Sequence, residues 1–137
     1  MKTVKKIGQI VLIVITSITF SCKAQTIEEN LTNLSTDIIG VWINEEDSNW
    51  SIEFTVDHKC HWYYSGDLTN TFSYSISITS PQCKQEVKTG GLEDFYLRLI
   101  NYEDNDAYCY EILGVDGNTL SLSSIGLGVK NFYFNKQ

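Results

Sequence analysis

The chain has 137 residues, of which 42% are hydrophobic and 12% aromatic, with one proline and a formal net charge of −7. This length favours a single domain, and the apolar content excludes an intrinsically disordered chain. The acidic balance argues against nucleic acid as a partner, because the chain has no excess of basic residues to neutralise a run of phosphates.

The N-terminus has the pattern of a secretory signal peptide. Lys2, Lys5 and Lys6 form a basic start, and residues 7–20 are almost wholly apolar. The apolar run is shorter than the roughly 20 residues that a transmembrane helix needs, and no second run of that size follows. We therefore predict a signal peptide at residues 1–21 and no internal transmembrane helix.

Two cleavage sites are possible at the end of this segment. In the first, Thr19-Phe20-Ser21-Cys22 is a lipobox, and Cys22 becomes the lipidated N-terminus of a membrane-anchored lipoprotein. In the second, cleavage after Ala24 releases a soluble protein that is secreted or periplasmic. We favour lipidation of Cys22, because a cysteine directly behind a small residue at the end of an apolar run is otherwise hard to explain. The expected location is the cell envelope.

The mature chain is more acidic than the precursor. Removal of residues 1–21 takes away three lysines and no acidic residue, which leaves seven basic and 17 acidic residues and a net charge of −10. Such a charge keeps a small domain soluble and repels anionic surfaces. We therefore expect a monomer that is held at the membrane by its N-terminal lipid and not by charge.

Residues 22–29 are predicted to be a polar tether, and residues 30–137 the folded domain. Apolar residues at Leu31, Leu34, Ile38 and Ile39 recur close to the helical spacing of 3.6 residues. Two acidic residues suit the start of a helix, and Gly40 suits its end. The pattern predicts one short helix over residues 28–39.

From Gly40 onward, apolar and polar residues alternate as they do in β-strands. The predicted strands cover residues 40–43, 50–56, 60–64, 71–79, 95–102, 107–113, 119–123 and 129–134. Most separators are short turns, such as Asp116-Gly117, and residues 80–94 form the one long loop. Eight short strands with one apolar face predict an all-β fold, in which an antiparallel meander closes into a small barrel and hides its edges.

Several motifs in this order resemble a known family. Gly40-Val41-Trp42 opens the first strand directly after a short helix, as in the Gly-x-Trp signature of lipocalins. The motifs that follow are Cys109-Tyr110-Glu111-Ile112, the run from Asp116-Gly117-Asn118 to Leu122, and Phe132-Tyr133-Phe134-Asn135-Lys136. Over about residues 38–137 the chain is similar to the small lipocalin-like lipoproteins of the Bacteroidetes, which implies a lipocalin-like barrel and an envelope location.

The chain departs from classical lipocalins at two points. It is much shorter, so the loops that usually form the ligand mouth are reduced. It also has no arginine near its end to stack on Trp42, so that Lys130 or Lys136 would have to serve. We expect Trp42 to close the base of the barrel beneath the helix, and Trp50 to lie exposed at the start of its strand.

Three cysteines remain in the mature domain if Cys22 is lipidated. Cys83 lies in the long loop and Cys109 in a predicted strand. A bridge between them would close a loop of about 26 residues and contribute roughly 3 kcal/mol. We predict the Cys83–Cys109 disulfide; reduced thiols, or Cys60 as a partner, are the alternatives.

The aromatic residues decide whether the barrel has room for a ligand. The candidates for the barrel interior are Phe54, Trp62, Tyr64, Phe72, Tyr74, Tyr110, Phe132 and Phe134. They either line a pocket for a small apolar ligand or simply fill the barrel. The first reading predicts a ligand-binding lipocalin-like module, and the second a structural or interaction lipoprotein. An interior cavity below about 300 Å³ would count against the first.

Sequence patterns of enzymes and metal sites are missing. There is no Gly-x-Ser-x-Gly elbow, no His-Glu-x-x-His and no glycine-rich phosphate loop, so we predict no enzyme activity and no cofactor. His58, Cys60 and His61 gather near one turn, but residues 60 and 61 of a strand point to opposite faces, and no fourth ligand is evident. We predict no metal site there, and solvated turns at the acidic residues 45–47 and 103–106.

Overall fold

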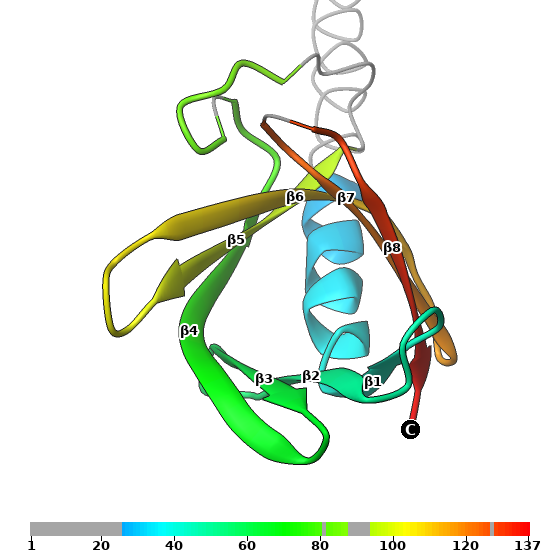
Figure 1. Ribbon diagram of the computed structural model, residues 1–137. Helices are drawn as coiled ribbons and strands as arrows, with labels where there is room; N and C mark the ends of the chain where they lie inside the picture. The colour runs from blue at the N-terminus through cyan, green and yellow to red at the C-terminus, as the bar shows by residue number, and fades with distance from the viewer. Residues whose placement is uncertain (1–25, 81, 88–93, 127) are drawn as a thin grey trace, which may run out of the picture.

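A computed structural model describes residues 26–80, 82–87, 94–126 and 128–137. The predicted signal peptide, Cys22 and the start of the predicted tether lie outside these residues, as do positions 81 and 88–93 of the predicted long loop. In the described part, eight antiparallel strands form one closed barrel in chain order, with β1 paired to β8. Figure 1 shows the strands arranged in a ring, with the helix seen across its middle. The predicted all-β barrel with a short N-terminal helix is confirmed.

The strands are close to the predicted ranges. They are β1 (Gly40–Asn44), β2 (Trp50–Phe54), β3 (Lys59–Tyr64), β4 (Asp67–Ser77), β5 (Phe95–Asn101), β6 (Ala107–Val115), β7 (Thr119–Ser124) and β8 (Asn131–Lys136).

Turn chemistry explains two of the differences from the predicted ranges. Ser65 and Gly66 both have positive φ, at 52° and 86°, and they join Tyr64 directly to Asp67 in a two-residue hairpin. Such turns match the twist of the flanking strands, so β4 begins at residue 67 and not at 71. In contrast, β2 ends early, because the backbone N–H of Thr55 already donates to the carbonyl of Lys59 across the next turn, at 2.9 Å.

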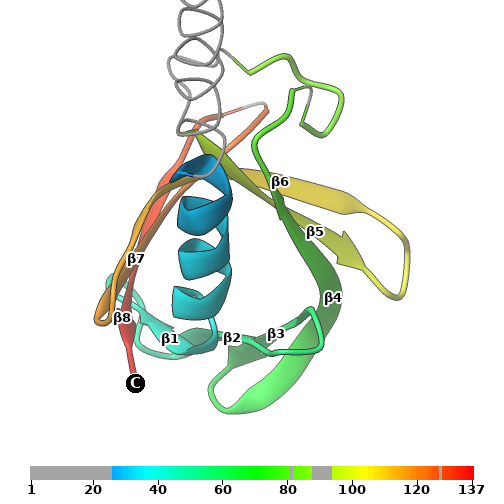
Figure 2. The ribbon, with the colours of Figure 1, turned by 180° about the vertical axis from the view of Figure 1, so that it is seen from behind.

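The helix covers residues 26–37, so residues 26–29 of the predicted tether form its first turn. It ends two residues before the predicted boundary, because the chain turns sharply into β1 at Gly40, whose φ is 134°. Ile38 is fully buried in the core, and Leu34 packs against it. Figure 2 shows the helix in front of the strands, so that it crosses one end of the barrel, which we call the base.

Residue parity decides which side chains lie inside the barrel. Away from the two register shifts, even-numbered residues face inward on seven strands and odd-numbered residues do so on β5, as the pairs Phe72↔Asn101 and Leu97↔Tyr110 show. The inward side chains form one apolar core. Where β1 pairs with β8, Trp42 lies opposite Lys136, the last residue of β8.

Candidate functional site

The interior of the barrel is packed with side chains. Its remaining void has a volume of about 10 Å³. The residues around this void are Trp50, Ile52, Phe54, Trp62, Leu97, Leu99, Tyr110, Leu122, Phe132 and Phe134. A void of this size holds at most one water molecule, whereas pockets for small molecules start at about 300 Å³. The geometry therefore does not provide the interior ligand pocket that one of the two sequence readings predicts, because the aromatic side chains fill it.

Seven of the eight predicted interior aromatics face the inside of the barrel. Phe54, Phe72 and Phe134 are at most 2% exposed, and Tyr74 and Tyr110 are also buried. Trp62 and Phe132 are only partly buried and pack on the edge of the core. These residues meet edge to face or tilted, as in Phe54 and Tyr74, whose ring centroids are 5.1 Å apart. Such contacts stabilise the packed interior beyond the area that they bury.

The prediction for Tyr64 is wrong. Its side chain is 51% exposed, because it stands at the last position of β3, opposite Asp67, where the strand leaves the barrel. It has the same parity as Trp62, but the barrel wall ends before it. Alternation indicates the face of a strand and not how far along the strand the core extends.

The expectation for Trp50 is also wrong. It lies partly buried among other rings, with centroid distances of 5.9 Å to Trp62, 5.6 Å to Phe132 and 5.2 Å to Phe134. The signal for this position was available in the sequence, because Trp50 has the same parity as Ile52, which lies inside the barrel.

Trp50, Trp62, Tyr108 and Phe132 form what we call the aromatic rim, at the end of the barrel away from the helix. The strand register places them there, since the opposite end of β2 pairs with Gly40 beside the helix. Tyr108 is 40% exposed, and its ring centroid lies 6.2 Å from that of Trp62. The rim therefore closes the core with rings that remain partly open to solvent.

One polar atom in this region is unsatisfied. The indole Nε1 of Trp62 is buried and has no hydrogen-bond partner among the described residues. Burial raises the pKa of the nearby Cys60 thiol to about 12, and the Trp62 indole opposes this shift without cancelling it. Burial likewise raises the pKa of the Tyr110 hydroxyl to about 12. The interior thus keeps its few titratable groups in their neutral forms.

The base of the barrel is organised around Trp42, as the Gly-x-Trp signature predicts. Trp42 is fully buried, and its Nε1 donates a hydrogen bond to the carbonyl of Ile38 at 2.7 Å. The Lys136 ammonium lies 4.8 Å from the Trp42 ring centroid, and it also donates to the carbonyl of Asp37 at the end of the helix. Lys136 therefore takes the place expected for a basic residue on Trp42. Lys130 instead lies over Phe132, at 5.1 Å.

Gly40 is favoured at this position by its conformation, because L side chains rarely adopt its φ of 134°. A Cβ atom built on it would lie 2.9 Å from the Cε of Lys136. The lysine stem thus passes directly over the glycine on its way to Trp42. The Lys136 side chain therefore contacts Gly40, Trp42 and the end of the helix at one place.

The predicted Cys83–Cys109 disulfide is confirmed, with a Cα–Cα distance of 5.8 Å. It fastens the chain after β4 to the outer face of β6. Tyr96, which points outward from β5, is only 1% exposed on the same side. Cys60 remains a free thiol in the core. The disulfide therefore holds the described part of the loop around Cys83 against the outer face of β6.

The other sequence candidates are structural. Asn44 accepts hydrogen bonds from the backbone N–H groups of Glu46 and Asp47, which orders the first acidic turn. His61 points to the outer face, where its Nδ1 lies 3.1 Å from the hydroxyl oxygen of Thr71. Within the described ranges, no three His, Cys, Asp or Glu side chains come together as metal ligands would.

Comparison of the chain with protein-family models, curated proteins and solved structures finds no match. The described residues also contain no helix that is long and apolar enough to cross a membrane. The arguments below therefore rest on the barrel, its base and its rim.

Proposed function

We propose that the chain is an exported, lipid-anchored, lipocalin-like module whose barrel is a packed scaffold, and that it acts through contacts of its outer surface with other proteins of the cell envelope. The observation that carries this proposal is the interior void of about 10 Å³. A barrel that encloses a ligand needs a cavity roughly thirty times larger. The eight-stranded fold and the Trp42–Lys136 contact at its base support the lipocalin-like part of the proposal.

Export is supported by the disulfide. Bridges such as Cys83–Cys109 persist in oxidising compartments and are rare in the cytosol. Anchoring rests on the Ser21-Cys22 boundary, which the described residues do not include. A lipid on Cys22 would hold the barrel close to the membrane, because only three residues separate Cys22 from residue 26, which is already helical.

A second candidate function is binding of a small apolar molecule inside the barrel. The observation that favours it is the unsatisfied Nε1 of Trp62, since a buried polar atom without a partner often marks a missing water or ligand. Entry would require the partly buried rings of the aromatic rim to move apart. This candidate is weaker, because such movement would also have to open most of the required volume.

Native mass spectrometry of protein purified from its own host separates the two candidates. The packed scaffold predicts the mass of the mature polypeptide with its N-terminal lipid and no further adduct in the barrel. The packed scaffold would be contradicted by an adduct that Trp62→Ala loses and Tyr64→Ala, at the exposed end of the same strand, retains. Such a result would favour the interior ligand.

Membrane fractionation tests the anchor. A Cys22→Ser variant is expected to move from the membrane to the soluble envelope fraction. Cys60→Ala is the matched control, because it also removes a thiol but cannot change lipidation of Cys22. If Cys22→Ser fractionates like the parent protein, the lipid-anchor part of the proposal is wrong.

A further inference from the structure

A groove with a volume of about 370 Å³ lies at the base of the barrel, between the helix and inward-facing residues of β4, and it shares no residue with the small interior void. Its walls come from the helix, from the turn between β2 and β3, and from the end of β4. The residues around it are Leu31, Ser35, His58, Tyr74, Ser75 and Ile76. In the view of Figure 2 the helix crosses the base nearer to β7 and β8 than to β4, and the groove lies on the β4 side. Its volume is within the range of small-molecule pockets.

The groove is apolar along its length and polar at one side. Leu31 of the helix and Ile76 of β4 supply aliphatic walls, and the ring of Tyr74 lies between them and the core. The Tyr74 hydroxyl is already engaged, because it donates to the carbonyl of Thr55 at 3.1 Å. The exposed His58 imidazole, with its centroid 5.4 Å from that of Tyr74, supplies the polar side.

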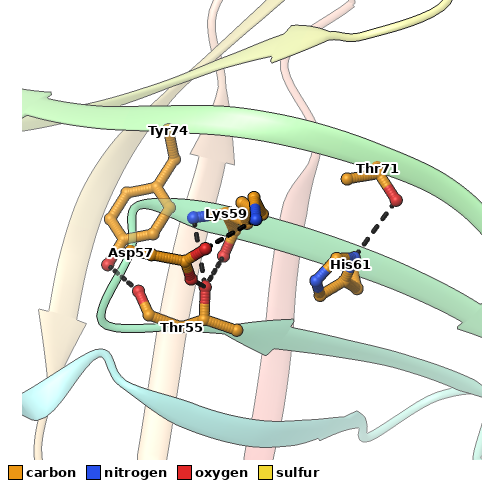
Figure 3. A network of polar contacts seen from close by, with 6 residues as sticks. All are labelled: Thr55, Asp57, Lys59, His61, Thr71 and Tyr74. Carbon is orange, nitrogen blue, oxygen red and sulfur yellow. Dashed lines mark hydrogen bonds and ion pairs between the residues drawn. The ribbon is translucent and has the colours of Figure 1, made fainter.

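The turn that carries His58 is held in place by a network of polar contacts (Figure 3). The Thr55 hydroxyl donates to the Asp57 carboxylate at 2.6 Å and accepts the backbone N–H of Lys59 at 3.2 Å. The ammonium of Lys59 lies 2.6 Å from the same carboxylate. His58, between these residues, has a left-handed backbone with φ of 60°. The backbone of the turn that carries the imidazole is thus held in place beside the groove by contacts of its neighbours.

We propose that this groove binds a small, uncharged, mostly apolar molecule that makes one hydrogen bond to His58. The aliphatic and aromatic walls match an apolar body, and the imidazole can accept from or donate to a single polar group. An anion is disfavoured, because the Asp57 carboxylate adjoins His58 and the chain as a whole is acidic. This inference does not depend on the proposed function, since the groove shares no residue with the interior void on which that proposal rests.

N-phenyl-1-naphthylamine is a suitable probe, because it is uncharged, apolar and carries one N–H group, and its fluorescence rises when it leaves water. Titration of the mature protein is expected to show saturable binding with one site. A Ser35→Trp variant should weaken binding at least tenfold, because Ser35 lines the groove from the helix and the indole would take up part of its volume. Thr36→Trp is the matched control at the next position of the helix, which is exposed and is not among the groove residues, and it should bind like the parent.

A second pair of variants tests the polar side. His58→Gly removes the imidazole but retains the left-handed backbone, which glycine adopts without strain. It is expected to weaken binding about three- to tenfold, as loss of one hydrogen bond does. Asn105→Gly makes the same change at another residue with positive φ, on the β5–β6 turn, and should have no effect.

Two results would overturn the proposal. One is the absence of saturable binding to the parent protein. The other is equal affinity of the parent and Ser35→Trp, with circular dichroism showing both to be folded, since the probe would then bind elsewhere. Loss of binding in Trp62→Ala alone would assign the probe to the barrel interior and would also refute the groove.

Discussion

Replacement of Trp42 by alanine tests whether the base of the barrel carries a large share of its stability. Trp42 is fully buried, and its indole both packs in the core and donates to the carbonyl of Ile38. Removal of a buried tryptophan side chain typically costs about 3–5 kcal/mol, and the lost hydrogen bond places Trp42→Ala in the upper half of that range. Because domains of this size are stable by only about 5–15 kcal/mol, the variant should be close to the limit of folding.

Urea unfolding of the mature protein measures this loss. With a denaturant dependence of about 1–3 kcal/mol per M, a loss of about 4 kcal/mol lowers the midpoint by more than about 1 M. Trp50→Ala should cost about 2 kcal/mol, because Trp50 is partly buried against three rings, and the exposed Tyr64→Ala should cost less than about 0.5 kcal/mol. A Trp42→Ala midpoint within 0.3 M (roughly) of that of Tyr64→Ala would refute the assigned role of the base.

The contact between Lys136 and Trp42 can be separated from burial of the indole. Lys136→Met keeps most of the aliphatic stem but removes the ammonium, and it should cost about 0.5–1 kcal/mol. The same substitution in a Trp42→Ala background should cost measurably less, because the ring that attracts the charge is gone. Equal costs in the two backgrounds would show that the ammonium acts only on the helix carbonyl of Asp37.

Three further predictions concern the turn, the disulfide and the free thiol. The hydrogen bond from Lys59 is the chief cause that lowers the pKa of Asp57 to about 2. The contact therefore stabilises the fold fully above a pH of about 4, and this stabilisation is lost as the pH falls towards 2. In a Lys59→Met variant the pKa of Asp57, measured by NMR titration, should move back towards 3.8. A Cys83→Ser/Cys109→Ser variant should lose about 3 kcal/mol in urea unfolding, and a loss below about 1 kcal/mol would show that the loop is held by its other contacts. Burial raises the pKa of Cys60 to about 12, so a thiol reagent at pH 8 should modify it only in urea; rapid modification of the native protein would contradict its burial.

Much of the barrel could be predicted from alternation and turn residues. Parity correctly places Phe54, Phe72 and Phe134 inside, because successive residues of a strand face opposite sides of the sheet. It fails for Tyr64, because the length of the buried stretch depends on where the neighbouring strands end. The early start of β4 depends on a left-handed conformation at Ser65, which residue type alone does not indicate.

The candidate sites were less predictable, because they depend on long-range placement. The volume left inside the barrel is set by how bulky rings interlock, and two sequences with the same apolar pattern can differ in it. The groove at the base exists only because the helix lies away from β4, and no local pattern around Leu31 or Ile76 indicates that distance. The Cys83–Cys109 bridge was predictable because few cysteines limit the choices.

The pairing of β1 with β8 has a consequence for how the protein folds. It joins the two ends of the domain, and the Lys136–Asp37 contact spans 99 positions of the chain. Until β8 arrives, the outer edges of β1 and β7 have unpaired N–H and C=O groups, which are sites for association with other chains. Contacts this distant in sequence form slowly, because a long loop must close first. The last strand therefore acts as the closing step of assembly, and a partly folded chain without it would be the form most prone to aggregate.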